Sequence, residues 1–216
     1  MRSALVVAGL LLLAPVAPAT AAVGVSIGIN IPVYPRLVPV PGYPVYYAPG
    51  IDSNYFFYDG LYWDFDGSNW YSSAWYNGPW TVVDPYAVPV YLLRIPVRYY
   101  HRPPGWFHGW AVTGAPHWHE HWGPSWADRR ADWVHWDGRG RIPARAPLPA
   151  YQRRYAGEHY PRAEDQARFH SQNYRYAPRE QVVQQHYADH GYQHVQREEH
   201  RAVARDNRRD EHHDRR

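Results

Sequence analysis

The densest group of metal-binding side chains lies in residues 116–122, which read PHWHEHW. Side chains alternate along a β-strand, so an extended backbone would place His117, His119 and His121 on one face. Three imidazoles with Glu120 nearby form a ligand set that zinc or copper accepts. One hypothesis is therefore that the chain is a periplasmic divalent-metal-binding protein that uses these three histidines.

The same residues also contain H-x-x-E-H, which is the inverted zinc-protease motif. In a helix, His117 and His121 would be the metal ligands and Glu120 would be the general base. Pro116 and the Gly123-Pro124 pair enclose the segment, however, and favour a loop that packs over a sheet. We therefore assign no catalytic residue to this motif.

Other catalytic patterns are missing from the sequence. It contains no G-x-S-x-G elbow, no P-loop and no dinucleotide fingerprint. Asp64, Asp66 and Asp84 could act as glycosidase carboxylates only across a cleft, and short hairpins offer no evident cleft. The absence of cysteine excludes a catalytic thiol and any disulfide. The sequence predicts a non-enzymatic protein that binds no cofactor, with the metal hypothesis as the alternative.

The elements that must position these side chains are short aromatic runs separated by turn dipeptides. Asp59-Gly60, Asp66-Gly67 and Asn77-Gly78 are strong signals for two-residue hairpin turns. Aromatic side chains also recur at alternate positions between these turns, as cross-strand pairs in a sheet require. The pattern predicts an antiparallel meander with strands at residues 55–58, 61–65, 69–76 and 80–83, and a further strand at 88–94.

A helix is expected directly after the histidine segment. Ser125 is a suitable N-cap, and Gly138 stands just beyond the other end. The helix would pack on the sheet, which gives an α+β domain, mainly antiparallel β, over residues 51–138. The side of the helix that faces the sheet would consist of Trp126, Arg130, Trp133 and Trp136.

The N-terminus has the three parts of a secretory signal peptide, predicted at residues 1–21. Arg2 is followed by an apolar run and by Ala19-Thr20-Ala21, an A-x-A cleavage site. Later segments are too short or too polar to cross a membrane as a helix. Residues 22–50 contain six prolines and are expected to form an extended linker. The mature protein is therefore expected in the periplasm or outside the cell.

Residues 139–216 are rich in Arg, Gln, His and acidic side chains. Such a segment buries too little apolar surface to offset its chain entropy, so a disordered tail is expected. Two weak helices are predicted within it, near residues 178–189 and 195–207.

Composition points to binding through aromatic and basic side chains. The chain has 11 Trp and 20 Tyr, and its formal net charge is only +3. Exposed rings can stack on sugars or partner side chains, and arginines can contact phosphates. The low charge argues against nucleic acid as a partner. Envelope glycans, lipopolysaccharide or another protein are the expected partners.

One motif in the meander resembles a known group of proteins. Trp75-Tyr76-Asn77-Gly78-Pro79-Trp80 reads W-x-x-G-x-W, and degenerate copies precede it from residue 57. The pattern resembles short exported Gram-negative proteins with WxxGxW or YxxGxW aromatic repeats, a family without an assigned activity. The resemblance implies a structural role for Trp75, Gly78 and Trp80, and an envelope or secreted protein that acts through interactions.

Overall fold

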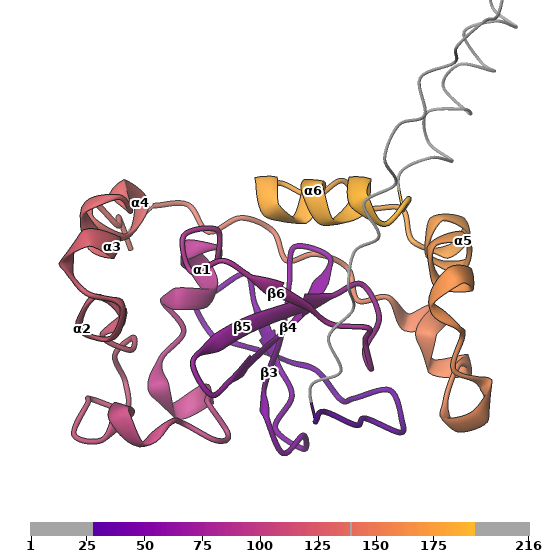
Figure 1. The fold of residues 1–216 in the computed structure, drawn as a ribbon, viewed down its shortest axis with the longest axis horizontal. Coiled ribbons are helices and arrows are strands. Elements are labelled where there is room, and N and C mark those ends of the chain that lie inside the picture. The colour runs from indigo at the N-terminus through magenta and orange to yellow at the C-terminus, as the bar shows by residue number, and fades with distance from the viewer. Residues whose placement is uncertain (1–27, 139, 193–216) are drawn as a thin grey trace, which may run out of the picture.

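The computed structural model describes residues 28–138 and 140–192 of the chain. Its centre is a six-stranded sheet in which every pair of neighbouring strands is antiparallel and the spatial order follows the chain order. This confirms the predicted α+β meander (Figure 1). The strands are β1 (Val38–Pro39), β2 (Tyr46–Tyr47), β3 (Asn54–Tyr58), β4 (Leu61–Asp66), β5 (Asn69–Ser73) and β6 (Thr81–Val83).

The turn between β3 and β4 and the turn between β4 and β5, which are the first two predicted, depend on positive backbone φ angles. Asp59-Gly60 connects the pair Tyr58 and Leu61 with φ values of 51° and 95°, as a two-residue primed turn requires. The second turn is Gly67-Ser68, because Asp66 still pairs with Asn69. The predicted turn at Asp66-Gly67 is therefore wrong by one residue. Aspartate at position 66 can remain in the strand because the glycine supplies the positive φ.

The third predicted turn, at Asn77-Gly78, is not a two-residue hairpin turn. β5 ends at Ser73 and β6 begins at Thr81, so residues 74–80 form a longer connection than the predicted two-residue turn at Asn77-Gly78. Within it the Gly78 N–H donates to the Trp75 carbonyl at 3.1 Å, which closes a local turn. Strand pairing ends early because residues 74–80 bind to other parts of the chain.

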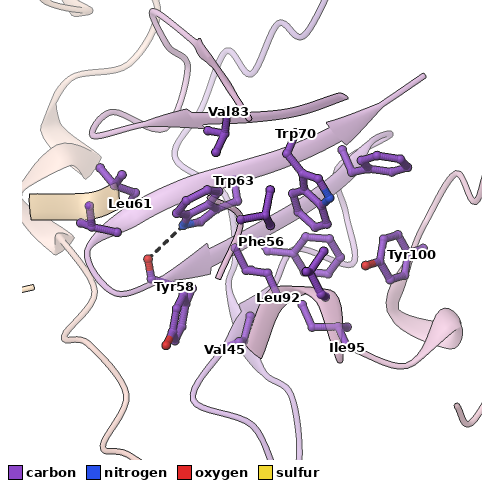
Figure 2. Close-up of a cluster of buried hydrophobic side chains, with 14 of the residues drawn as sticks. Val45, Phe56, Tyr58, Leu61, Trp63, Trp70, Val83, Leu92, Ile95 and Tyr100 are labelled. Atoms are coloured by element: carbon purple, nitrogen blue, oxygen red, sulfur yellow. Dashed lines mark hydrogen bonds between the residues drawn. The ribbon is translucent and has the colours of Figure 1, made fainter. Parts of the chain in front are cut away.

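Both faces of the sheet are buried. Figure 2 shows the first face, on which Phe56, Trp63 and Trp70 pack against residues after β6. The side chains that alternate with these, such as Tyr55 and Tyr62, pack in a second cluster on the opposite face. Strands buried on both sides are apolar or aromatic at successive positions, which accounts for the density of rings in β3 and β4.

Four short helices follow β6 in the chain. They are α1 (Val90–Leu93), α2 (Trp118–Trp122), α3 (Pro124–Asp128) and α4 (Ala131–Val134). The predicted strand at residues 88–94 is wrong, because α1 occupies this region. Pro89 is the N-cap of α1, and its carbonyl accepts the Leu92 N–H at 3.0 Å.

The single helix predicted from Ser125 is also wrong, because α3 and α4 are separate. Gly123 rather than Ser125 is the N-cap of α3, and Pro124 is its first residue. Arg130 leaves the helical conformation between α3 and α4, with φ −114° and ψ 71°. Its buried side chain has partners elsewhere, described below.

The regions predicted as linker and tail are folded where the structure describes them. In the linker, Ile31, Val40 and Val45 are buried, and residues 28–50 supply β1 and β2. In the tail, α5 (Ala163–Asn173) was not predicted, whereas α6 (Gln181–Asp189) confirms the first weak helix. The domain boundaries at 50 and 138 are therefore wrong.

Polar side chains help these regions to pack. Gln152 and Gln166 are buried and bond to the connection at 74–80, so a low apolar content did not prevent folding. No described helix is long and apolar enough to cross a membrane. The predicted signal peptide and the second weak tail helix lie outside the described residues.

Candidate functional site

The histidine segment is helical rather than extended. His117 precedes α2, and its Nδ1 lies 2.8 Å from Glu120 Oε1. The His121 ring stacks on Trp106 at 3.8 Å between centroids and 4° between planes, and His117 stacks on Trp110 at 4.7 Å. The prediction of a loop is wrong, but Trp118 of this segment does pack on the sheet as expected, against Phe65 and Trp70.

These contacts separate the three candidate metal ligands. His119 is solvent-exposed, and its ring centroid is 6.0 Å from that of His117. Within the residues that the structure describes, no group of three His, Cys, Asp or Glu side chains can hold a metal ion. The hypothesis that His117, His119 and His121 bind zinc or copper together is therefore not supported by their placement. The rings of His121 and His117 instead cover faces of Trp106 and Trp110 on which a sugar could otherwise stack.

The motif residues Trp75, Gly78 and Trp80 have structural surroundings. Trp75 belongs to the buried cluster on the first face of the sheet, whereas Trp80 belongs to the cluster on the second. The Gly78 carbonyl accepts hydrogen bonds from Tyr160 Oη at 2.6 Å and Gln166 Nε2 at 3.1 Å. The motif therefore holds the second half of the chain against the sheet.

A groove of about 480 Å³ lies between β6, the turn that follows it and α6. In Figure 1, α6 runs beside the β6 end of the sheet. The groove combines an exposed apolar strand with carboxylates and imidazoles, which makes it the best candidate for a binding site. Its lining includes Val82, Asp84, Tyr86, Glu180, His186 and Asp189.

The strand register shows which backbone groups of β6 face this groove. A two-residue turn is closed by a hydrogen-bonded pair, here Asp66 and Asn69, and such pairs alternate along antiparallel strands. Tyr71 therefore bonds to β4, and its neighbours in β5 bond to β6. Tyr71 is paired with Val82, so the N–H and C=O of Val82 point away from the sheet. No described residue bonds to them.

The other wall of the groove is fixed by the carboxylate of Asp59. Its Oδ2 accepts the backbone N–H groups of Arg179 and Glu180 at 2.8 and 2.7 Å, where α6 begins. Its Oδ1 accepts the Tyr176 hydroxyl at 2.6 Å. Asp59 is fully buried and lies in the turn between β3 and β4, so this turn caps a helix that is distant in sequence.

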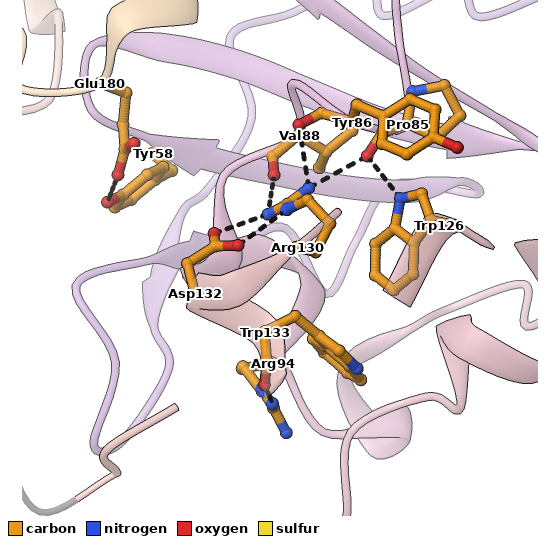
Figure 3. A network of polar contacts seen from close by, with 10 residues as sticks. All are labelled: Tyr58, Pro85, Tyr86, Val88, Arg94, Trp126, Arg130, Asp132, Trp133 and Glu180. Atoms are coloured by element: carbon orange, nitrogen blue, oxygen red, sulfur yellow. Dashed lines mark hydrogen bonds and ion pairs between the residues drawn. The ribbon is translucent and has the colours of Figure 1, made fainter. Parts of the chain in front are cut away.

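Glu180 links the same end of α6 to the sheet. Tyr58 Oη donates to Glu180 Oε1 at 2.5 Å (Figure 3). Burial raises the pKa of the Glu180 carboxyl, and burial together with Glu180 raises the pKa of the Tyr58 hydroxyl. Tyr58 therefore remains the hydrogen-bond donor at neutral pH, and the pair can orient a ligand through hydrogen bonds.

Arg130 fixes the turn after β6, which forms one end of the groove. Figure 3 shows its guanidinium between the carboxylate of Asp132 and backbone carbonyls from the segment 85–88. Pro85, Tyr86 and Val88 accept from it at 3.1, 3.2 and 2.9 Å. A buried charge is stable only when it is paired and hydrogen-bonded, as this one is.

A second group of histidines lies against the groove. His186 on α6 and His170 on α5 are both buried, and burial lowers the pKa of each to about 3. The Tyr192 ring lies 4.7 Å from His170 and 6.1 Å from His186, and His190 stacks on His186 at 4.2 Å. At neutral pH the His170 and His186 rings are therefore uncharged, and they pack against tyrosine rings as in an aromatic core.

Sequence reasoning did not identify the groove. Asp59 was recognised only as a turn residue, and Glu180 and His186 fell within the expected tail. The weak helix predicted near residues 178–189 was the one signal that an ordered wall existed here. Its partners lie in β3 and β6, more than ninety positions away in sequence, so no local pattern could reveal them.

No family model, curated protein or solved structure matches this chain.

Proposed function

We propose that this chain is a non-enzymatic interaction protein of the bacterial envelope, or a secreted one, and that it binds an extended polypeptide segment in the groove between β6 and α6. The observation that carries the proposal is the orientation of Val82. Its N–H and C=O point out of the sheet and have no partner in the described parts of the chain. A bound segment would add to the sheet as a further antiparallel or parallel strand.

The geometry of the groove favours the addition of a strand to β6 over other ways of binding a polypeptide. An unpaired edge strand is a template for another strand, and each main-chain hydrogen bond adds about 0.5 to 1.5 kcal/mol. α6 stands opposite the edge and confines the incoming segment to an extended path. The groove volume of about 480 Å³ is within the range of ordinary ligand sites.

The remaining parts of the proposal rest on sequence. The A-x-A site and apolar run at residues 1–21 support export, and the absence of recognised catalytic patterns supports a binding role. The W-x-x-G-x-W motif at residues 75–80 supports membership of the exported aromatic-repeat group. Envelope glycans that bind by ring stacking are less favoured as partners, because histidines stack on the Trp106 and Trp110 rings.

The test uses residues 22–216 and a neutral, acetylated and amidated peptide of alternating serine and valine, labelled with a fluorophore. We expect saturable binding by fluorescence anisotropy and slower hydrogen exchange of the Val82 amide in the complex. Val82→Pro removes the outward N–H without removing a bond to β5, and proline is tolerated on edge strands. This variant should lose most of the binding.

Val82→Thr is the matched control, because threonine keeps the N–H and suits a strand. It should bind the peptide as the parent chain does. If Val82→Pro folds normally and binds the peptide as tightly as Val82→Thr, strand addition at β6 is wrong.

A further inference from the structure

We infer that the segment bound in this groove is basic, with Arg or Lys at alternate positions around an apolar residue that lies opposite Val82. This inference rests on the proposed function and adds the chemistry of the partner. It follows from two properties of the groove: the direction of the side chains on β6, and the charges on the walls.

The direction of the partner's side chains is set by the pleat of the sheet. Val83 belongs to the buried cluster on the first face, together with Val183 and Tyr187 from α6. In a paired strand, the residue opposite Val82 projects to the same face as the Val82 side chain, and its two neighbours project to the other face. Those two neighbours therefore point toward α6.

The walls that these neighbours meet are acidic. Asp84, Glu180 and Asp189 line the groove, and none of the described residues that line it is arginine. Asp84 Oδ1 accepts the Tyr86 N–H, and Asp189 Oδ1 accepts from Gln185 Nε2 at 2.6 Å. The second oxygen of each carboxylate has no partner among the described residues. Arg or Lys would supply donors to these oxygens, whereas an acidic segment would be repelled.

The apolar position is set by Val82 itself. Its side chain is 48% exposed at the rim of the groove. A β-branched or aromatic residue directly opposite it would cover this surface, as cross-strand pairs do. The expected pattern is therefore basic, apolar, basic, with the apolar residue in register with Val82.

The experiment compares three acetylated and amidated hexapeptides that share valine at alternate positions. The intervening residues are arginine, serine or glutamate, and the protein is residues 22–216 at pH 8, where an ordinary imidazole is neutral. At low salt the arginine peptide should bind about 3- to 10-fold more tightly than the serine peptide, since two exposed ion pairs add that much. The glutamate peptide should bind most weakly. In 0.5 M NaCl the three affinities should converge.

A double variant tests which carboxylates recognise the peptide. Asp84→Asn with Asp189→Asn should remove most of the advantage of the arginine peptide over the serine peptide, with both affinities measured on the same variant. Glu158→Gln with Glu164→Gln is the matched control, because it makes the same change in net charge at exposed positions outside the groove. It should keep the preference for arginine.

The outcomes separate the two proposals. If the serine and arginine peptides bind equally at low salt, the inference of a basic partner is wrong and strand addition stands. If no peptide binds, the proposed function fails as well. If peptides bind only after residues 22–27 are deleted, the chain's own N-terminal segment holds the edge and both proposals are overturned.

Discussion

His117, His119 and His121 are neighbours in the chain. In contrast, His170 lies in α5, His186 lies in α6 and His190 directly follows α6. The first group is spread over the surface of α2, where two of its rings stack on separate tryptophans. The second group is gathered around Tyr192, and two of its members are buried. Proximity in sequence therefore did not produce a cluster here, but the packing of α5 and α6 did.

The buried and the exposed histidines should differ in how they make the folding stability depend on pH. A histidine that is buried in the folded chain but exposed in the unfolded chain binds its proton more readily when the chain unfolds. Acid should therefore act on the seam between α5 and α6, where burial holds two pKa values near 3. The surface histidines of α2 should contribute little. Four predictions test this comparison, in order of decreasing effect.

The largest effect is expected from His170 and His186. Their folded pKa of about 3 lies below the unfolded value near 6.5, so stability is lost as the pH falls below 6.5. Each would cost about 1.4 kcal/mol per pH unit, or about 7 kcal/mol for both at pH 4. His170→Leu with His186→Leu should flatten this dependence in urea unfolding series. Equal pH slopes in parent and variant would contradict the assignment.

Asp64 should give an effect of opposite sign, because burial raises its pKa to about 8. Above about pH 4 the Asp64 carboxyl loses its proton in the unfolded chain, whereas in the folded chain it keeps the proton up to about pH 8. The free energy of unfolding should therefore fall as the pH rises from 4 to 8. Asp64→Asn should remove this loss. The variant's advantage should grow by about 1.4 kcal/mol per pH unit over that range. Urea unfolding at pH 5 and pH 8 measures it, and a constant difference would refute it.

Gly78 tests whether a local motif depends on distant contacts. Its φ is +84°, and a Cβ there would lie 2.8 Å from Trp80 Cδ1. Gly78→Val should cost about 2 to 4 kcal/mol in thermal or urea unfolding. Gly50→Val is the control, because Gly50 has open space around it and no positive φ, and it should change stability by less than about 0.5 kcal/mol. Equal losses in both variants would show that the turn geometry is unimportant.

The smallest effect is expected from the surface histidines. A triple variant should change the unfolding free energy by less than about 1 kcal/mol; it carries His117→Gln, His119→Gln and His121→Gln. Burial lowers the pKa of His121, so the variant should show a slight decrease in acid sensitivity. Calorimetric titration with zinc should show no stoichiometric site in the parent chain. If the parent chain binds zinc with submicromolar affinity and this variant does not, the conclusion that His117, His119 and His121 form no cluster is wrong.

Local sequence patterns determined much of the sheet. Asp59-Gly60 and the alternating aromatic residues predicted β3, β4 and the antiparallel order, because positive φ angles and the strand period depend on adjacent residues. The same local reasoning failed where backbone groups bind distant partners. It placed a strand at α1 and a two-residue turn at Asn77-Gly78, where Tyr160 and Gln166 hold the chain.

The sequence by itself therefore determined the meander, the α+β class and the existence of α6, since turn chemistry and periodicity are encoded over a few residues. The tertiary structure alone decided that residues 140–192 cover the sheet, because burial of Gln152 or His170 depends on partners supplied by other segments. It also decided where a binding site could form. The groove exists because Asp59 caps α6 opposite an unpaired edge of β6, and these residues meet only in the folded chain.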